Sequence, residues 1–111
     1  MGETCGFDYS IVDRVVDAIV EDVRPEKIII FGSVANRTAR PDSDVDMLIV
    51  MDTDKRPVER SFAIERALFS RNLLIDRDII VVTPAEFEDR VDDEYSFVHH
   101  AFKTGVVAYE V

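Results

Sequence analysis

The chain has little of several residue types that mark particular classes of protein. Its 111 residues include one cysteine, Cys5, and no tryptophan. A single cysteine can form no disulfide within the chain, and without neighbouring ligands it holds no structural zinc ion, so we interpret it as an ordinary terminal thiol. No apolar run is long enough to cross a bilayer, and residues 1–9 lack the pattern of a signal peptide. These absences predict a cytoplasmic protein.

Positive charge is also scarce. Lys and Arg number 13 against 23 Asp and Glu, which gives a formal net charge of −10. Such a charge repels phosphate and argues against any extended nucleic-acid interface. The acidity and the excess of Arg over Lys are typical of a salty cytoplasm, although nucleotide composition can produce the same skew. The length fits a single domain that spans residues 1–111.

Apolar periodicity and chain breakers predict alternating helices and strands. Helical spacing of apolar residues, Arg24-Pro25 as a breaker and a Thr83–Glu86 capping box define the helices. We expect helices over 10–23, 56–71, from 84 and over 96–103, and strands over 27–31, 45–51, 78–82 and 106–111. Residues 33–39 are expected to form a short helix or turn. The second strand is apolar on both faces, as expected for a central strand.

Two polar motifs lie where these strands end and begin. Gly32-Ser33 follows the first strand, and Asp44-Val45-Asp46 opens the second. Carboxylates at i and i+2 of a strand point to the same side, so Asp44 and Asp46 can hold one metal ion or bridge two. A glycine at the first site lets backbone N–H groups approach an anion closely.

Contact between the two motifs in the fold would fix the relative directions of the strands. If Gly32-Ser33 lies against Asp44 and Asp46, the first two strands run antiparallel. The helix over 56–71 is then a right-handed crossover, which makes the third strand parallel to the second and brings Asp78 beside the pair. Asp76 competes for this place, but Asp78 adjoins the apolar run directly and is preferred.

Three neighbouring carboxylates repel one another unless a divalent cation lies among them. Mg²⁺ prefers oxygen ligands together with nucleotide phosphates, so Asp44, Asp46 and Asp78 predict a metal site. The alternative is that these residues form the solvated entrance to a strand in an acidic protein.

The spacing of Gly32-Ser33, ten further residues and Asp44-Val45-Asp46 resembles that of the minimal nucleotidyltransferases of the DNA polymerase β superfamily. The resemblance implies an α/β (α+β) nucleotidyltransferase fold, a small mixed sheet covered by helices. It also implies that Asp44, Asp46 and Asp78 hold two Mg²⁺ ions and carry catalysis, with Asp78 helping to deprotonate the acceptor. Gly32 and Ser33 would bind the β- and γ-phosphates of ATP.

The chain departs from the family pattern after Gly32-Ser33. The family continues Arg-Ala-Arg-Gly, whereas Val34-Ala35-Asn36-Arg37 stands here. Arg37 and Arg40 could reach the triphosphate instead, because a guanidinium makes bidentate phosphate contacts. They could equally be surface charges.

Small domains of this form resemble the antitoxin half of two-gene modules whose partner is a helical HEPN ribonuclease toxin. The resemblance implies a protein adenylyltransferase that moves AMP from ATP to a tyrosine of the toxin. A chain of this length suits an acceptor that is docked by a partner surface. Two alternatives remain: an antitoxin that acts by binding alone with a degenerate site, and a nucleotidyltransferase with a small-molecule acceptor.

Overall fold

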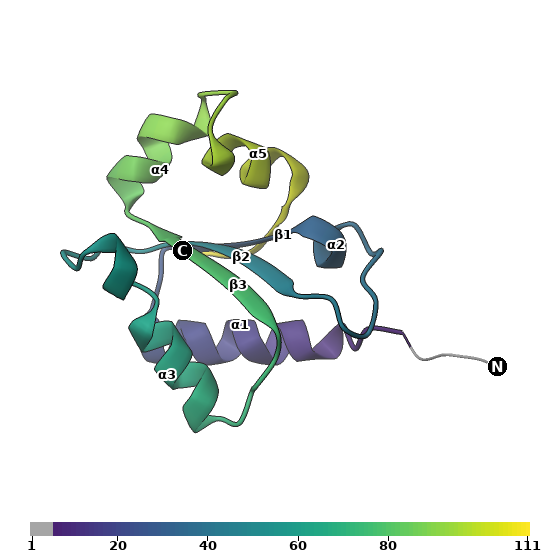
Figure 1. The fold of residues 1–111 in the computed structure, drawn as a ribbon. Helices are drawn as coiled ribbons and strands as arrows, with labels where there is room; N and C mark the ends of the chain where they lie inside the picture. Colours follow the sequence, from purple (N-terminus) through teal and green to yellow (C-terminus); the bar gives the residue numbers. More distant parts are fainter. Residues whose placement is uncertain (1–5) are drawn as a thin grey trace.

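The protein folds as one four-stranded mixed sheet between two helical layers (Figure 1). The computed structural model describes residues 6–111, so Cys5 lies outside the described residues. The sheet has the order β3-β2-β1-β4. Its strands are β1 (Lys27–Phe31), β2 (Val45–Val50), β3 (Arg77–Val82) and β4 (Val106–Glu110).

Two helices cover each face of the sheet. Figure 1 shows α1 (Ser10–Val23) and α3 (Phe62–Ser70) below the sheet, and α4 (Pro84–Val91) and α5 (Phe97–Thr104) above it. No helix within residues 6–111 has the length and apolar character needed to span a membrane.

The strand directions follow the predicted topology. β1 pairs antiparallel with β2, and β2 pairs in parallel with β3 through the crossover that contains α3. β4 returns antiparallel along the other side of β1. The register sets Phe31 opposite Asp46, and Asp46 beside Asp78. The end of β1 therefore lies beside the starts of β2 and β3, and these three strand ends carry the polar motifs.

Apolar side chains on both faces of β2 build two cores. Val45, Met47 and Ile49 are buried with the α1 and α3 side chains, whereas Leu48 and Val50 are buried with those of α4 and α5. This confirms the prediction of a central strand. Because successive side chains alternate along a strand, Asp46 belongs to the face covered by α4 and α5.

Local signals place most helix ends as expected. Arg24 ends α1 in a left-handed conformation with φ 55°. Thr83 and Glu86 form the predicted capping box at the start of α4, where each side chain accepts a hydrogen bond from the other's backbone N–H. The four orphan N–H groups of a helix start need such acceptors, which explains the sharp boundary.

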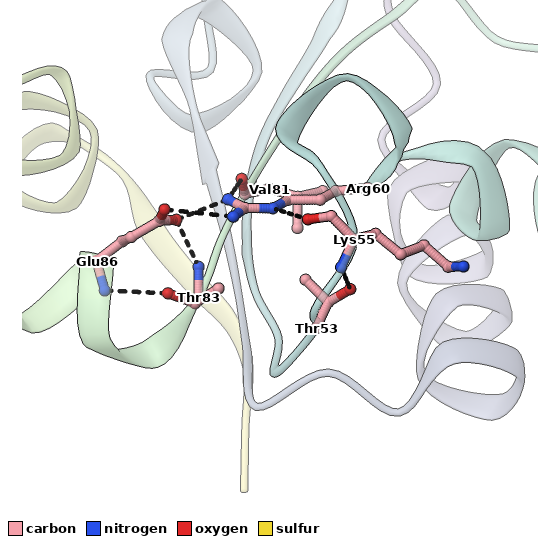
Figure 2. Close-up of polar contacts among 6 residues, drawn as sticks. All are labelled: Thr53, Lys55, Arg60, Val81, Thr83 and Glu86. Carbon is pink, nitrogen blue, oxygen red and sulfur yellow. Dashed lines mark hydrogen bonds and ion pairs between the residues drawn. The ribbon is translucent and has the colours of Figure 1, made fainter.

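The continuous helix predicted over residues 56–71 is wrong. The chain forms a 3-10 turn, η1 (Pro57–Glu59), and α3 begins only at Phe62. The interruption coincides with Arg60, whose guanidinium donates to the carbonyl oxygens of Lys55 and Val81 and to the Glu86 carboxylate (Figure 2). These contacts tie the crossover to β3 and α4, a tertiary constraint that helical periodicity does not encode.

Candidate active site

A glycine in a left-handed conformation joins β1 to the short helix α2 (Gly32–Ala35). Gly32 has φ 75°, which a side chain disfavours, and a Cβ built there would overlap the carboxylate of Asp46. The residue is glycine for both reasons. Gly32 and Asp46 therefore touch across the β1–β2 pair, as the sequence predicts.

The aspartates of the predicted metal site lie at neighbouring positions where β2 and β3 begin. Asp46 is half-buried and lies in register with Asp78 on the parallel strand β3. Asp44 and Asp78 are exposed, and Asp44 precedes β2 by one residue with the same alternation as Asp46. The competitor Asp76 lies before β3, where its carbonyl oxygen accepts a hydrogen bond from Val45 at 2.9 Å. The structure thus brings Asp78 to the strand position beside Asp46.

These carboxylates interact electrostatically. Burial raises the pKa of Asp46 above its ordinary value, and the negative charges of Asp78 and Asp44 raise it further. A raised carboxyl pKa means that the folded protein disfavours the charged form of Asp46. A cation bound among these groups would remove that penalty.

The carboxylate oxygens of Asp44, Asp46 and Asp78 suit a divalent cation, although the three side chains do not converge on one coordination centre. Among residues 6–111, no three His, Cys, Asp or Glu side chains converge closely enough to form a metal site. Carboxylate oxygens are nevertheless the ligands that Mg²⁺ prefers, and the shared repulsion at Asp46 is of the kind that a hard cation relieves. The three aspartates lie at the starts of β2 and β3.

The remaining predicted phosphate ligands lie in the segment between α2 and β2. Ser33 is half-buried in α2, and its carbonyl oxygen accepts a hydrogen bond from the Thr38 N–H at 2.9 Å. Arg40 is exposed in a turn that is closed by Ser43. Ser33 adjoins Gly32 beside the aspartates, whereas Arg40 lies in the exposed turn that follows α2.

Arg37 is held on the side of the sheet covered by α1. It has φ 62°, and its guanidinium carbon lies 4.0 Å from the centroid of the Tyr9 ring. The Tyr9 hydroxyl also accepts a hydrogen bond from the Ala39 N–H at 3.3 Å. Asp46 faces the opposite side of the sheet, so Arg37 would have to leave Tyr9 to reach a phosphate near the aspartates.

Sequence reasoning missed an ion pair that supports the start of β3. Arg77 donates from Nε to Glu65 of α3 at 2.6 Å and from Nη1 to the Ile75 carbonyl oxygen at 2.7 Å. Arg77 immediately precedes Asp78 and points to the other face of the sheet. The pair fixes the backbone at this point, and no sequence motif marks it.

A match to a known family agrees with this geometry. The family model described as "Nucleotidyltransferase domain" matches residues 12–103, which include both polar motifs and Asp78. The chain belongs to the nucleotidyltransferase domain family. No curated protein matches it.

Solved structures share the nucleotidyltransferase fold. A chain from Sulfolobus solfataricus described as a candidate nucleotidyltransferase superimposes with a TM-score of 0.61 and 22% identity, over 92% of this chain and 79% of that one. A chain from a toxin–antitoxin crystal structure with AMP-PNP gives 0.59 and 13% identity, over 95% and 75%. At these identities the likeness supports the fold.

Proposed function

We propose that this nucleotidyltransferase domain transfers AMP from ATP to a hydroxyl acceptor, with two Mg²⁺ ions held by Asp44, Asp46 and Asp78. One observation carries the proposal: Gly32 lies against the carboxylate of Asp46, which is in register with Asp78. This arrangement puts a phosphate-binding turn beside oxygen ligands for a cation.

Different residues carry out different parts of the nucleotidyl transfer. The acceptor oxygen attacks the α-phosphorus, the bond to the β-phosphate oxygen breaks, and pyrophosphate leaves. Gly32 and Ser33 bind the β- and γ-phosphates through their backbone and hydroxyl, and the exposed carboxylate of Asp78 receives the acceptor proton. Asp44, Asp46 and Asp78 would hold divalent cations, which would supply neutralisation of the charge that develops on the phosphates.

The finer proposal is a cytoplasmic antitoxin that adenylylates a tyrosine of a helical HEPN ribonuclease toxin. The structural neighbour from a toxin–antitoxin crystal with AMP-PNP supports both a toxin partner and an adenine nucleotide. Arg37 and Arg40 are the proposed additional ligands of the triphosphate.

Transfer can be tested with ATP labelled at the α-phosphate, Mg²⁺ and candidate acceptor proteins. We expect label to become covalently attached to a tyrosine, and attachment to be lost in Asp46→Asn and in excess chelator. Asp54→Asn, which changes an exposed carboxylate beyond the other end of β2, is the matched control and should transfer normally. Label on a small molecule instead would support the alternative acceptor.

A second candidate is an antitoxin that acts by binding alone. The stacking of Arg37 on Tyr9, in a segment that lacks both arginines and the second glycine of the family pattern, favours it. If Asp46→Asn neutralises the toxin as well as the unchanged protein does, and the toxin stays unmodified, this second candidate is correct.

A further inference from the structure

An open groove of about 810 Å³ lies on the α1 side of the sheet, outside the aspartate site. One wall is α1 and the floor is the edge strand β4, and we name it the α1–β4 groove. Val12, Asp13, Val16 and Asp17 line the α1 wall, and Val106 and Ala108 line the floor.

The floor of the α1–β4 groove is an uncovered apolar part of the sheet. Val106 pairs with Ile30 and shares its face, but Val106 is 55% exposed whereas Ile30 is 4% exposed. α1 and α3 cover the corresponding face of the inner strands, with β4 left at the edge of the four-stranded sheet. The α1-side face of β4 at Val106 is therefore left largely uncovered.

The α1 rim of the groove is acidic, whereas the groove also contains a cation, Arg37, which is stacked on Tyr9. Asp13 and Asp17 are exposed and stand four residues apart on α1, so they project on the same side of the helix. Neither forms an ion pair with another residue in the 6–111 range. An occupant with apolar residues toward the floor and cations toward this rim would match both parts of the groove.

We propose that the α1–β4 groove binds a basic amphipathic helix of a protein partner. A second copy of this chain is a poor occupant, because each copy carries a formal charge of −10. An added strand would use the edge of β4 and leave the Asp13–Asp17 rim without a partner. A helix lying beside α1 covers the floor and meets both carboxylates.

The groove is connected to the aspartate site through α2. Val34 and Ala35 line the groove, and the same short helix begins with Gly32 and Ser33. A docked helix would contact the element that carries the phosphate-binding turn. This inference extends the proposed function, since the docked protein would be the one that carries the acceptor hydroxyl.

Two synthetic helical peptides test the groove. One contains Leu and Lys over about 18 residues, which is five helical turns, and the other replaces every Lys by Glu. In heteronuclear NMR titrations we expect the Leu–Lys peptide to shift amides of α1, α2 and β4, and the Leu–Glu peptide to bind much more weakly. Asp13→Asn/Asp17→Asn should weaken the Leu–Lys peptide by about fivefold.

Matched variants separate the groove from general charge attraction. Glu88→Gln/Asp92→Asn removes two exposed carboxylates at the same spacing on the opposite side of the sheet and should leave binding unchanged. Val106→Ser should weaken binding by removing floor area without changing charge. Asp46→Asn should bind as the unchanged protein does, so a failure of nucleotidyl transfer alone would leave the groove assignment standing.

Three results would overturn the proposal. Shifts centred elsewhere, or equal weakening by the two acidic pairs, would mean that the peptide binds by charge alone. Shifts limited to the β4 amides would indicate an added strand. A dimer in sedimentation that Val106→Ser dissociates would identify a second copy as the occupant.

Discussion

Arg60 and Glu86 form a two-pronged ion pair between the crossover and the start of α4. The guanidinium donates to the two carboxylate oxygens at 2.7 and 3.3 Å, and the Arg60 side chain is only 11% exposed (Figure 2). Glu86 is also the capping-box residue of α4. One contact therefore joins a helix start to a segment 26 residues away.

We expect Arg60→Ala to lower the free energy of unfolding by about 2–3 kcal/mol, because it removes a largely buried, charged hydrogen-bond donor from the half-buried Glu86 carboxylate and from two carbonyls. Arg56→Ala is the control. Arg56 pairs with Glu59 at 3.1 Å but is 76% exposed, so its loss should cost less than about 0.5 kcal/mol. Urea unfolding measures both, and equal losses would contradict a special role for Arg60.

The same pair predicts a pH dependence. The Arg60 hydrogen bond, then the Thr83 backbone N–H, lower the pKa of Glu86 below its ordinary value of 4.5. A depressed folded-state pKa gives stability that is present above about pH 4.5 and is lost as the pH falls through the folded-state pKa. Glu86→Gln should therefore reduce stability near neutral pH and flatten the acid limb of the melting-temperature curve. An unchanged acid limb would contradict the linkage.

Asp46 has a pKa shift that is opposite in sign to that of Glu86. Its pKa is raised above 3.8, so its native-state contribution to stability falls as the pH rises from about that value, and the penalty persists at neutral pH. Without metal, Asp46→Asn should melt at the same temperature as the unchanged protein or a few degrees higher. The difference should shrink in acid. A variant that unfolds, or that keeps full transfer activity, would contradict the assignment of Asp46.

Gly32→Ala tests the contact between α2 and β2. The substitution imposes a Cβ on a φ of 75° and overlaps the Asp46 carboxylate, so we expect a loss of about 1–2 kcal/mol and no thermal shift on adding ATP and Mg²⁺. Gly6→Ala, at an exposed position before α1, is the control and should respond to ATP and Mg²⁺ normally. A normal nucleotide response in Gly32→Ala would show that the turn is not part of the binding site.

Local signals predicted much of the fold. α1 and β1 have the predicted bounds. The assumption that Gly32 lies close to Asp46 correctly predicted that β1 is antiparallel and β3 parallel to β2. These features depend on periodicity, breakers and one distance requirement. The family match then covers most of the chain.

Contacts between distant residues were the part that could not be predicted. The break before α3 coincides with the contact of Arg60 with Glu86, and Arg37 stacks on Tyr9, 28 residues earlier in the sequence. Alternation put the aspartates on one face, but it could not show how far burial and the charges of Asp78 and Asp44 raise the pKa of Asp46. Each outcome is decided by packing and electrostatics.

The last strand has a consequence for solubility. β4 pairs along β1, whose Ile28, Ile29 and Ile30 are almost wholly buried. Without β4, this apolar strand would present unpaired N–H and C=O groups at an open edge, which favours strand-to-strand aggregation between molecules. The short return after Gly105 thus shields the Ile28–Ile30 backbone from pairing with strands of other molecules.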